Sequence, residues 1–145
     1  MKASFAADYN NLKIAKIMYH DAESDEDRKN AGEMYQLTCN RINAQGANYA
    51  DMFRRYQDAQ ERRNQYIDFY GAIFNNQVEG LVADMKEFGI DNFTLSTGCS
   101  GAIETAWLFQ QAGCVIEGMV EINGICKEFM SDEYQKAHAF LFNVM

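Results

Sequence analysis

The sequence has 145 residues, of which 48% are apolar, and a formal net charge of −8 at pH 7. This length and apolar content predict one domain with its own core, needing neither disulfides nor a metal, and exclude a disordered chain. Residues 1–70 carry ten basic and eleven acidic side chains, whereas residues 71–145 carry three and ten. This imbalance favours a protein partner with a basic surface and disfavours direct contact with nucleic acid.

The sequence carries no membrane or secretion signal that we can recognise. Polar residues interrupt the first twenty positions, so no signal peptide is expected, and no run approaches the roughly 18 apolar residues of a membrane span. The cysteines lack a C-x-x-C spacing, which is typical of reduced thiols; they are Cys39, Cys99, Cys114 and Cys126. We therefore expect a cytoplasmic protein without membrane contact.

Helical periodicity dominates the first half of the chain. A first helix is predicted over residues 8–20, and a second runs to about residue 44, with Ser24 as its N-cap and acidic residues in its first turn. The second helix is expected to bury one row of side chains: Met34, Leu37, Thr38 and Ile42. The acidic run from Asp21 to Asp27 is not an EF-hand loop, because Glu26 and Gly32 occupy its sixth and twelfth positions.

A third, longer helix is predicted over residues 47–70. Its seam between Tyr49 and Tyr70 has heptad spacing: Tyr49, Met52, Tyr56, Ala59, Arg63, Tyr66 and Tyr70. The seam can pack against the second helix as an antiparallel hairpin, which its bulky aromatics favour, or against a copy of itself in a homo-oligomer. The helix also carries four arginines, but Asp51 and Asp58 each precede an arginine by four residues, which indicates a self-neutralised face rather than a phosphate-binding stripe.

The second half alternates between helices and strands. Helices are predicted over residues 76–88 and 101–112, the latter with Ile103, Ala106, Trp107 and Gln110 on one face, and strands over 93–96, 115–122 and 137–144. The dipeptide Asn123-Gly124 indicates a turn. A strand–helix–strand order predicts parallel pairing of the first two strands, and the last strand adds antiparallel.

The predicted fold class is therefore α+β, with an N-terminal helical hairpin of long helices packed on a small β-α-β-β C-terminal sheet. We expect a single domain over residues 1–145, in which residues 1–75 form a mainly helical scaffold and residues 76–145 an acidic α+β unit.

The second half also contains a set of packing and turn positions that resembles a unit of other proteins. These are residues 88–97 (FGIDNFTLST), Trp107 and Phe109 in the following helix, residues 112–114 (AGC) and residues 118–123 (GMVEIN). This strand–turn–helix–strand unit resembles small uncharacterised proteins of Firmicutes chromosomes, prophages and conjugative elements. The chain departs from these proteins in the segment between Gly124 and Ala137, because that segment lacks the polar hairpin that the resemblance leads us to expect. The resemblance implies a mobile-element origin and no particular activity.

The turn from Thr97 to Gly101 is where catalysis would be sought. A thiol at a helix N-terminus can have a lowered pKa, but a phosphatase loop requires arginine where Thr105 stands, and the G-x-S-x-G elbow is broken. Ser100, Asp132 and His138 occur in hydrolase order. A structural turn with Ser100 as cap is favoured, although its amide groups could hold an anion. No nucleotide-binding motif is present and the two histidines lack ligand spacing, so no catalytic residue, cofactor or metal is expected.

The favoured function is a non-enzymatic protein-interaction protein. Its expected partner-binding residues are acidic side chains of the second half: Glu117, Glu121, Glu128, Asp132 and Glu133. With a mobile-element or phage origin, such a surface could antagonise a basic nucleic-acid-binding or defence protein of the host. The alternatives are a small thiol or serine hydrolase that uses Cys99 or Ser100, and a homo-oligomeric structural protein.

Overall fold

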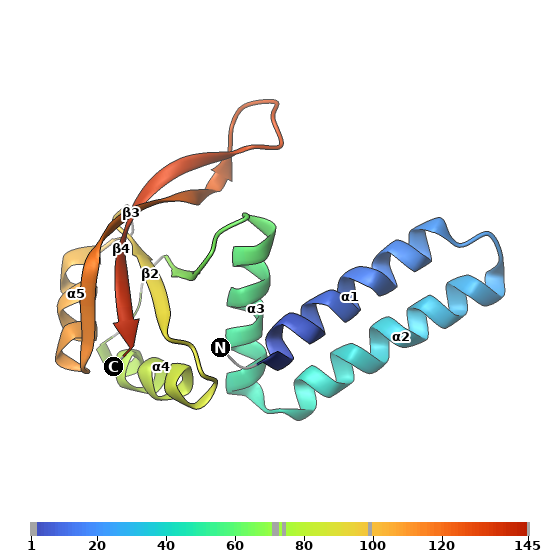
Figure 1. The fold of residues 1–145 in the computed structure, drawn as a ribbon, viewed down its shortest axis with the longest axis horizontal. Helices are drawn as coiled ribbons and strands as arrows, with labels where there is room; N and C mark the ends of the chain where they lie inside the picture. The colour runs from blue at the N-terminus through green and yellow to red at the C-terminus, as the bar shows by residue number, and fades with distance from the viewer. Residues whose placement is uncertain (1–2, 71–72, 74, 99, 145) are drawn as a thin grey trace. The chain divides into compact units, whose positions relative to one another are not determined.

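The computed structural model describes residues 3–70, 73, 75–98 and 100–144, which contain five helices and four strands (Figure 1). The fold is α+β, as predicted, with the sheet in the C-terminal part. The chain divides into two compact units, Met1–Phe53 and Arg54–Met145. The division falls within the third helix, whereas the sequence placed the change from helical scaffold to α+β unit near residue 75.

The first unit is built on a helical hairpin. Helix α1 (Ala3–Asp21) and helix α2 (Asp25–Ala44) lie side by side and antiparallel, so the predicted pairing of the second and third helices is wrong (Figure 1). The predicted N-cap is confirmed, because the backbone N–H of Asp27 donates to Ser24 Oγ at 3.1 Å. Three acidic residues follow this cap in the first turn of α2, where carboxylates interact favourably with the helix dipole.

Aromatic stacking and one buried carboxylate link α1 to helix α3 (Ala47–Glu61) inside this unit. The Phe5 ring stacks on Tyr49 with centroids 4.7 Å apart, and the Asp8 carboxylate accepts hydrogen bonds from Tyr49 and Arg41. Helix α2 buries Ala31, Thr38 and Ile42, a row with spacings of seven and four. Leu37 lies beside this row and is 68% exposed, so its predicted burial is wrong.

Helix α3 ends at Glu61, nine residues earlier than predicted. Arg63 adopts a left-handed conformation with φ of 61°, its N–H donates to Gln60 O, and the Asn64 N–H donates to Ala59 O at 2.8 Å. This pair of bonds is a Schellman motif, which terminates a helix. The predicted helical seam from Tyr49 to Tyr70 is therefore wrong, since Tyr66 and Tyr70 lie beyond the helix end.

The second unit contains a four-stranded mixed sheet with the order β1-β2-β4-β3. Strands β1 (Ile67–Phe69) and β2 (Asn92–Ser96) pair in parallel and are connected through helix α4 (Asn75–Glu87). Strand β4 (Tyr134–Val144) lies antiparallel between β2 and β3 (Cys114–Lys127). The predicted parallel pairing of the strands around residues 93–96 and 115–122 is wrong, because the unpredicted strand β1 occupies the parallel position.

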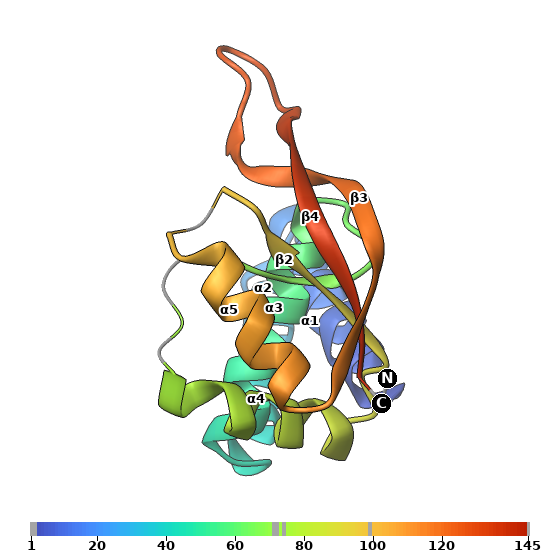
Figure 2. The ribbon, with the colours of Figure 1, turned by 90° about the vertical axis from the view of Figure 1, so that its left-hand side faces the viewer.

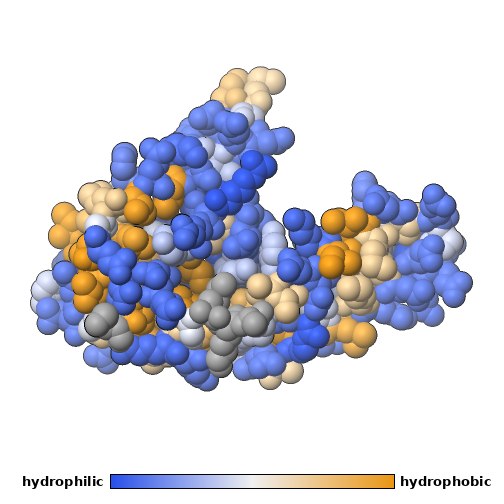
Figure 3. Space-filling model, viewed as in Figure 1, coloured by the Kyte–Doolittle hydropathy of each residue, from blue (hydrophilic) through white to orange (hydrophobic). Residues whose placement is uncertain are grey.

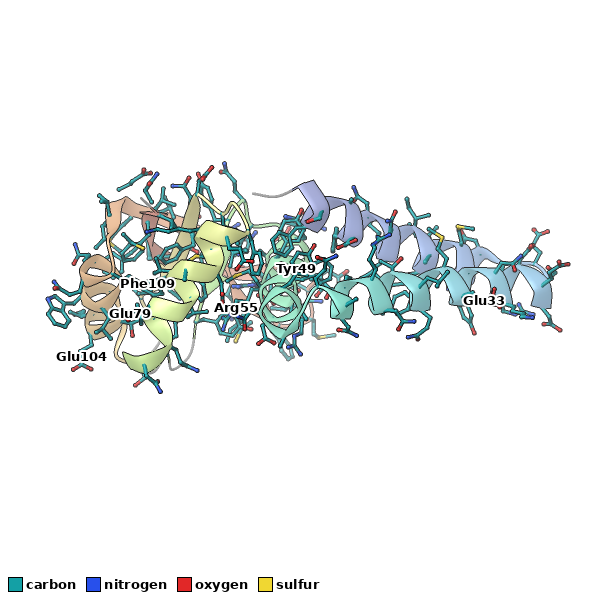
Figure 4. All side chains as sticks on the ribbon, turned by 90° about the horizontal axis from the view of Figure 1, so that it is seen from below. Glu33, Tyr49, Arg55, Glu79, Glu104 and Phe109 are labelled. Atoms are coloured by element: carbon teal, nitrogen blue, oxygen red, sulfur yellow. The ribbon has the colours of Figure 1, made fainter. Side chains whose placement is uncertain are left out.

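Phenylalanine rings from three strands and one helix form the core of this unit. The rings of Phe93 and Phe142 stack with centroids 4.9 Å apart, and Phe109 of helix α5 (Ala102–Gln111) lies 4.7 Å from Phe93. Phe109 points inward, whereas Glu104 points away from the unit (Figure 4). Of the four residues that the sequence placed on one face of α5, Ala106 is buried, whereas Ile103 and Trp107 are 82% and 57% exposed.

Strands β3 and β4 are the two longest strands of the sheet, and they form an antiparallel hairpin. Strand β2 pairs with β4 only from Ala139 to Asn143, so the distal part of the hairpin is a two-stranded ribbon that extends beyond the sheet (Figure 2). The predicted turn at Asn123-Gly124 is wrong, since β3 continues to Lys127. Residues 128–133 make the connection instead, and we refer to these six residues as the hairpin tip.

Candidate functional site

The hairpin tip brings together three of the five predicted partner-binding residues. Glu128, Asp132 and Glu133 are exposed and line one pocket of about 270 Å³. The pocket is also lined by basic and polar residues of the hairpin and of the α3 end: Arg62, Arg63, Asn123, Tyr134 and Lys136. The three carboxylates thus form one local group at the end of the ribbon.

The other two predicted residues lie elsewhere on the hairpin. Glu117 is exposed on β3 at a register irregularity between Ile116 and Gly118, and Glu121 is exposed opposite His138. With a rise of about 3.3 Å per residue, Glu121 lies roughly 20 Å along the chain from Glu128. Glu117 and Glu121 therefore belong to the body of the ribbon and not to the group at the tip.

Backbone and side-chain hydrogen bonds close the tip into a turn. The Glu128 N–H donates to Glu133 O at 2.8 Å, the Ser131 N–H to Glu128 O at 3.1 Å, and the Glu133 N–H to Ser131 Oγ at 3.0 Å. At the base of the loop the Lys127 ammonium lies 5.4 Å from the centroid of the Tyr134 ring, a cation–π contact. The acidic side chains are therefore presented by an ordered turn.

Two apolar residues of the tip were missed by the sequence reasoning. Phe129 and Met130 are 92% and 91% exposed, more than any other large apolar residue described. The sequence signal was available, since an adjacent Phe and Met within an acidic loop have no periodicity that would bury them. In the space-filling view, the end of the hairpin is apolar and the surface directly below it is hydrophilic (Figure 3).

A polar cluster of four buried and two half-buried residues anchors the ribbon to the sheet. We call it the Arg62–Asp68 cluster; its buried members are Arg62, Asn64, Asp68 and Thr94, and its half-buried members are Ser96 and Asn123. The Asp68 carboxylate accepts hydrogen bonds from Thr94 Oγ1 at 2.7 Å, from Ser96 Oγ at 3.0 Å and from Arg62 Nη2 at 3.2 Å. Burial raises the pKa of Asp68, and the hydrogen bond from Thr94 and the charge of Arg62 oppose this rise. The sequence predicted Arg62 on a solvated helix face, whereas it is 1% exposed.

Asn123 connects this cluster to the hairpin. Its carbonyl oxygen accepts hydrogen bonds from Arg62 Nη1 at 3.0 Å and Asn64 Nδ2 at 2.9 Å, and its own Nδ2 donates to Arg62 O at 2.7 Å. On the outer side, Lys136 Nζ donates to Asn123 Oδ1 at 2.6 Å. The contacts fix β3 where the ribbon leaves the sheet, and every buried side-chain polar atom described has a hydrogen-bond partner.

The turn before α5 does not assemble the hydrolase constellation considered from sequence. Ser100 lines a different pocket from the one that Asp132 lines. Ser100 is not the predicted cap: the N-cap of α5 is Gly101, with φ of 70° and no side-chain cap hydrogen bond. Cys99 lies outside the described residues. In the part of the chain that the structure describes, no three His, Cys, Asp or Glu residues are grouped to hold a metal, and no helix is long and apolar enough to cross a membrane.

Comparison with known proteins places the second unit in a family. Residues 51–144 match the family described as Domain of unknown function (DUF7698). The chain belongs to this family. The DUF7698 match covers the sheet, α4, α5 and the Arg62–Asp68 cluster, and it takes in all but the first residues of α3. No curated protein and no solved structure matches the chain.

Proposed function

We propose that this chain is a non-enzymatic protein-interaction protein whose β3–β4 hairpin binds a basic surface of a protein partner. The observation that carries the proposal is the grouping of Glu128, Asp132 and Glu133 on an ordered turn at the end of a ribbon that extends beyond the sheet. All three acidic side chains are exposed, so a basic group of a partner can reach them.

The charges along the hairpin support an acidic recognition element. From Cys114 to Val144 the hairpin carries five acidic and two basic residues. Both lysines contact neighbours of the hairpin itself: Lys127 lies over the Tyr134 ring, and Lys136 donates to Asn123. The net negative charge steers the approach of a basic partner and sets its orientation.

A finer version of the proposal is that the partner is a basic nucleic-acid-binding or defence protein of a host, antagonised by a mobile-element or phage accessory factor. Carboxylates on a projecting ribbon can occupy positions that phosphates occupy in a basic channel. This version requires that the partner lose nucleic-acid binding when the hairpin is bound. A mobility-shift assay with the purified partner, with and without this chain, tests that consequence.

Charge reversal tests the broader proposal. The full-length chain and the variant with Glu128→Lys, Asp132→Lys and Glu133→Lys are immobilised and exposed to lysate of the producing cell. The matched control reverses three exposed acids of the same unit: Glu79→Lys, Glu87→Lys and Asp91→Lys. We expect one partner to bind the wild type and the control and to be lost from the tip variant. Retention by the tip variant would contradict the proposal.

A further inference from the structure

The hairpin tip combines the carboxylate group with an unusually exposed apolar pair. Phe129 and Met130 are adjacent and are 92% and 91% exposed, while Glu128 precedes them and Asp132 and Glu133 follow within three residues. Apolar side chains at this exposure contribute almost nothing to the stability of the fold, because they are not removed from water. An exposed aromatic residue is also a feature of interface anchors.

The backbone conformation of the tip presents this pair in a fixed way. Met130 adopts a left-handed conformation with φ of 55°, which is uncommon for a residue with a side chain. The bonds from Ser131 N–H to Glu128 O and from Glu128 N–H to Glu133 O close the loop on both sides of the pair. A loop that is already ordered loses less conformational entropy when it binds.

We propose that Phe129 and Met130 form the anchor of the interaction, inserting into an apolar pocket on the partner that is rimmed by Arg or Lys side chains. The inference rests on the proposed function and adds the chemistry of the recognised site. The apolar pair supplies the area removed from water at the centre, and Glu128, Asp132 and Glu133 pair with the basic rim. A central anchor within a charged rim is the arrangement that concentrates binding energy in few residues.

The charges around Phe129 and Met130 favour a protein pocket over two other binding partners, an anionic membrane and a second copy of this chain. An anionic membrane surface attracts basic segments and repels carboxylates, so the flanking acids oppose insertion of Phe129 into such a bilayer. A second copy of the tip presents carboxylates of the same sign, which disfavours tip-to-tip association. A protein pocket with a basic rim satisfies both the apolar pair and the acids.

Site-specific photo-crosslinking tests the geometry in the producing cell. The photoreactive residue p-benzoylphenylalanine replaces Phe129 in the full-length chain, and in a control it replaces Ile103, which is 82% exposed on α5 of the same unit. We expect residue 129 to crosslink to one protein, at an apolar pocket with Arg or Lys at its rim, and the Ile103 control not to do so. Crosslinks to lipid, to a second copy, to many proteins or to none would overturn the inference.

Affinity measurements with the purified crosslinked partner separate the anchor from the charges. We expect Phe129→Ala with Met130→Ala to weaken binding by about 30-fold or more, with an unchanged salt dependence. Glu128→Gln, Asp132→Asn and Glu133→Gln together should weaken binding and flatten the salt dependence. If only the charge variant loses affinity, the anchor inference fails and the proposed function holds. If neither variant loses affinity, both fail.

Discussion

Arg62 and Asp68 form a buried ion pair in which Nη2 lies 3.2 Å from Oδ2, with side chains that are 2% and 0% exposed. Arg62 follows the last residue of α3 and Asp68 lies in β1, so the pair fixes the short strand to the helix end. Since Arg62 also donates to Asn123 O in β3, the same side chain positions the ribbon that carries the acidic tip.

Removing the cation of this pair should strongly destabilise the fold. Arg62→Met leaves the Asp68 carboxylate buried without a counter-ion and Asn123 O with one donor fewer, and we expect the free energy of unfolding to fall by about 3 kcal/mol or more. Urea denaturation of the full chain measures this change. The control Arg28→Met removes a cation whose partner Asp25 has a 99% exposed side chain, and should change stability by less than about 1 kcal/mol.

A second substitution tests whether the buried charge causes that loss. Adding Asp68→Asn to Arg62→Met removes the unpaired carboxylate and keeps one acceptor oxygen for the Thr94 hydroxyl, while the Ser96 hydroxyl can accept from the new amide group, so the double variant should be more stable than Arg62→Met alone. A double variant that is less stable than Arg62→Met would show that the ion pair is not the source of the effect.

The pH dependence of stability should carry the signature of Asp68. Burial raises its folded-state pKa above the usual 3.8, against the hydrogen bond from Thr94 and the charge of Arg62. The folded chain therefore retains the proton to higher pH than the unfolded chain, and this group's contribution to stability is present below the unfolded pKa and lost as pH rises through the folded pKa.

The variant Asp68→Asn lacks this titration. The free energy of unfolding of the wild type minus that of Asp68→Asn should fall as pH rises from about 3.8 through the folded-state pKa of Asp68. Urea denaturation of both proteins over a pH series provides the difference. A difference that rises with pH would mean that the Arg62 cation outweighs burial and that the folded pKa is lowered.

Two Schellman motifs in the second unit provide a matched pair of backbone substitutions. Arg63 and Gly89 occupy the same left-handed position, with φ of 61° and 69°, after α3 and after α4. A side chain in this conformation costs about 1 kcal/mol or more relative to glycine. Arg63→Gly should therefore stabilise the chain by about that amount and Gly89→Ala should destabilise it similarly, as measured by the midpoint of urea denaturation. Equal signs for both would contradict this assignment.

Most helices were predictable because their sequence signals are local. Ser24 with its acidic first turn identified the start of α2, and the helices predicted over residues 76–88 and 101–112 agree with α4 and α5 to within one residue at each end. The end of α3 was not predictable in this way, since apolar spacing continues through Tyr66 and Tyr70 and an arginine, rather than a glycine, takes the left-handed position. Because the third helix was predicted to continue to residue 70, the three-residue strand β1 was missed, and the parallel pairing was assigned to the wrong strands.

The site was predictable only in part, for a related reason. The acidic residues were found because net charge is a property of composition, but their grouping depends on where the hairpin turns. Asn123-Gly124 has the composition of a turn, yet Asn123 lies in an extended strand, where its carbonyl oxygen accepts hydrogen bonds from Arg62 and Asn64 and its side-chain amide donates to Arg62 O. Because β3 continues past Asn123 to Lys127, the turn lies at residues 128–133, and Phe129 and Met130 are exposed at the tip.

The apolar pair at the tip should be dispensable for folding. Phe129→Ser with Met130→Ser changes side chains that are 92% and 91% exposed, so the free energy of unfolding should stay within about 0.5 kcal/mol of the wild type. The control Phe93→Ser, at a site with 0% exposure, should lose about 3 kcal/mol or more. Thermal and urea denaturation report both values. A large loss in the tip variant would mean that the pair packs within the fold.

The salt dependence of partner binding tests most directly whether the hairpin is an acidic recognition element. The dissociation constant of the wild type with the purified partner is measured between 50 and 200 mM salt, beside the variant Glu128→Gln, Asp132→Asn and Glu133→Gln. We predict that wild-type affinity falls several-fold over this range and that the variant binds more weakly with little salt dependence. Equal affinities and equal salt dependence for the two proteins would contradict the account.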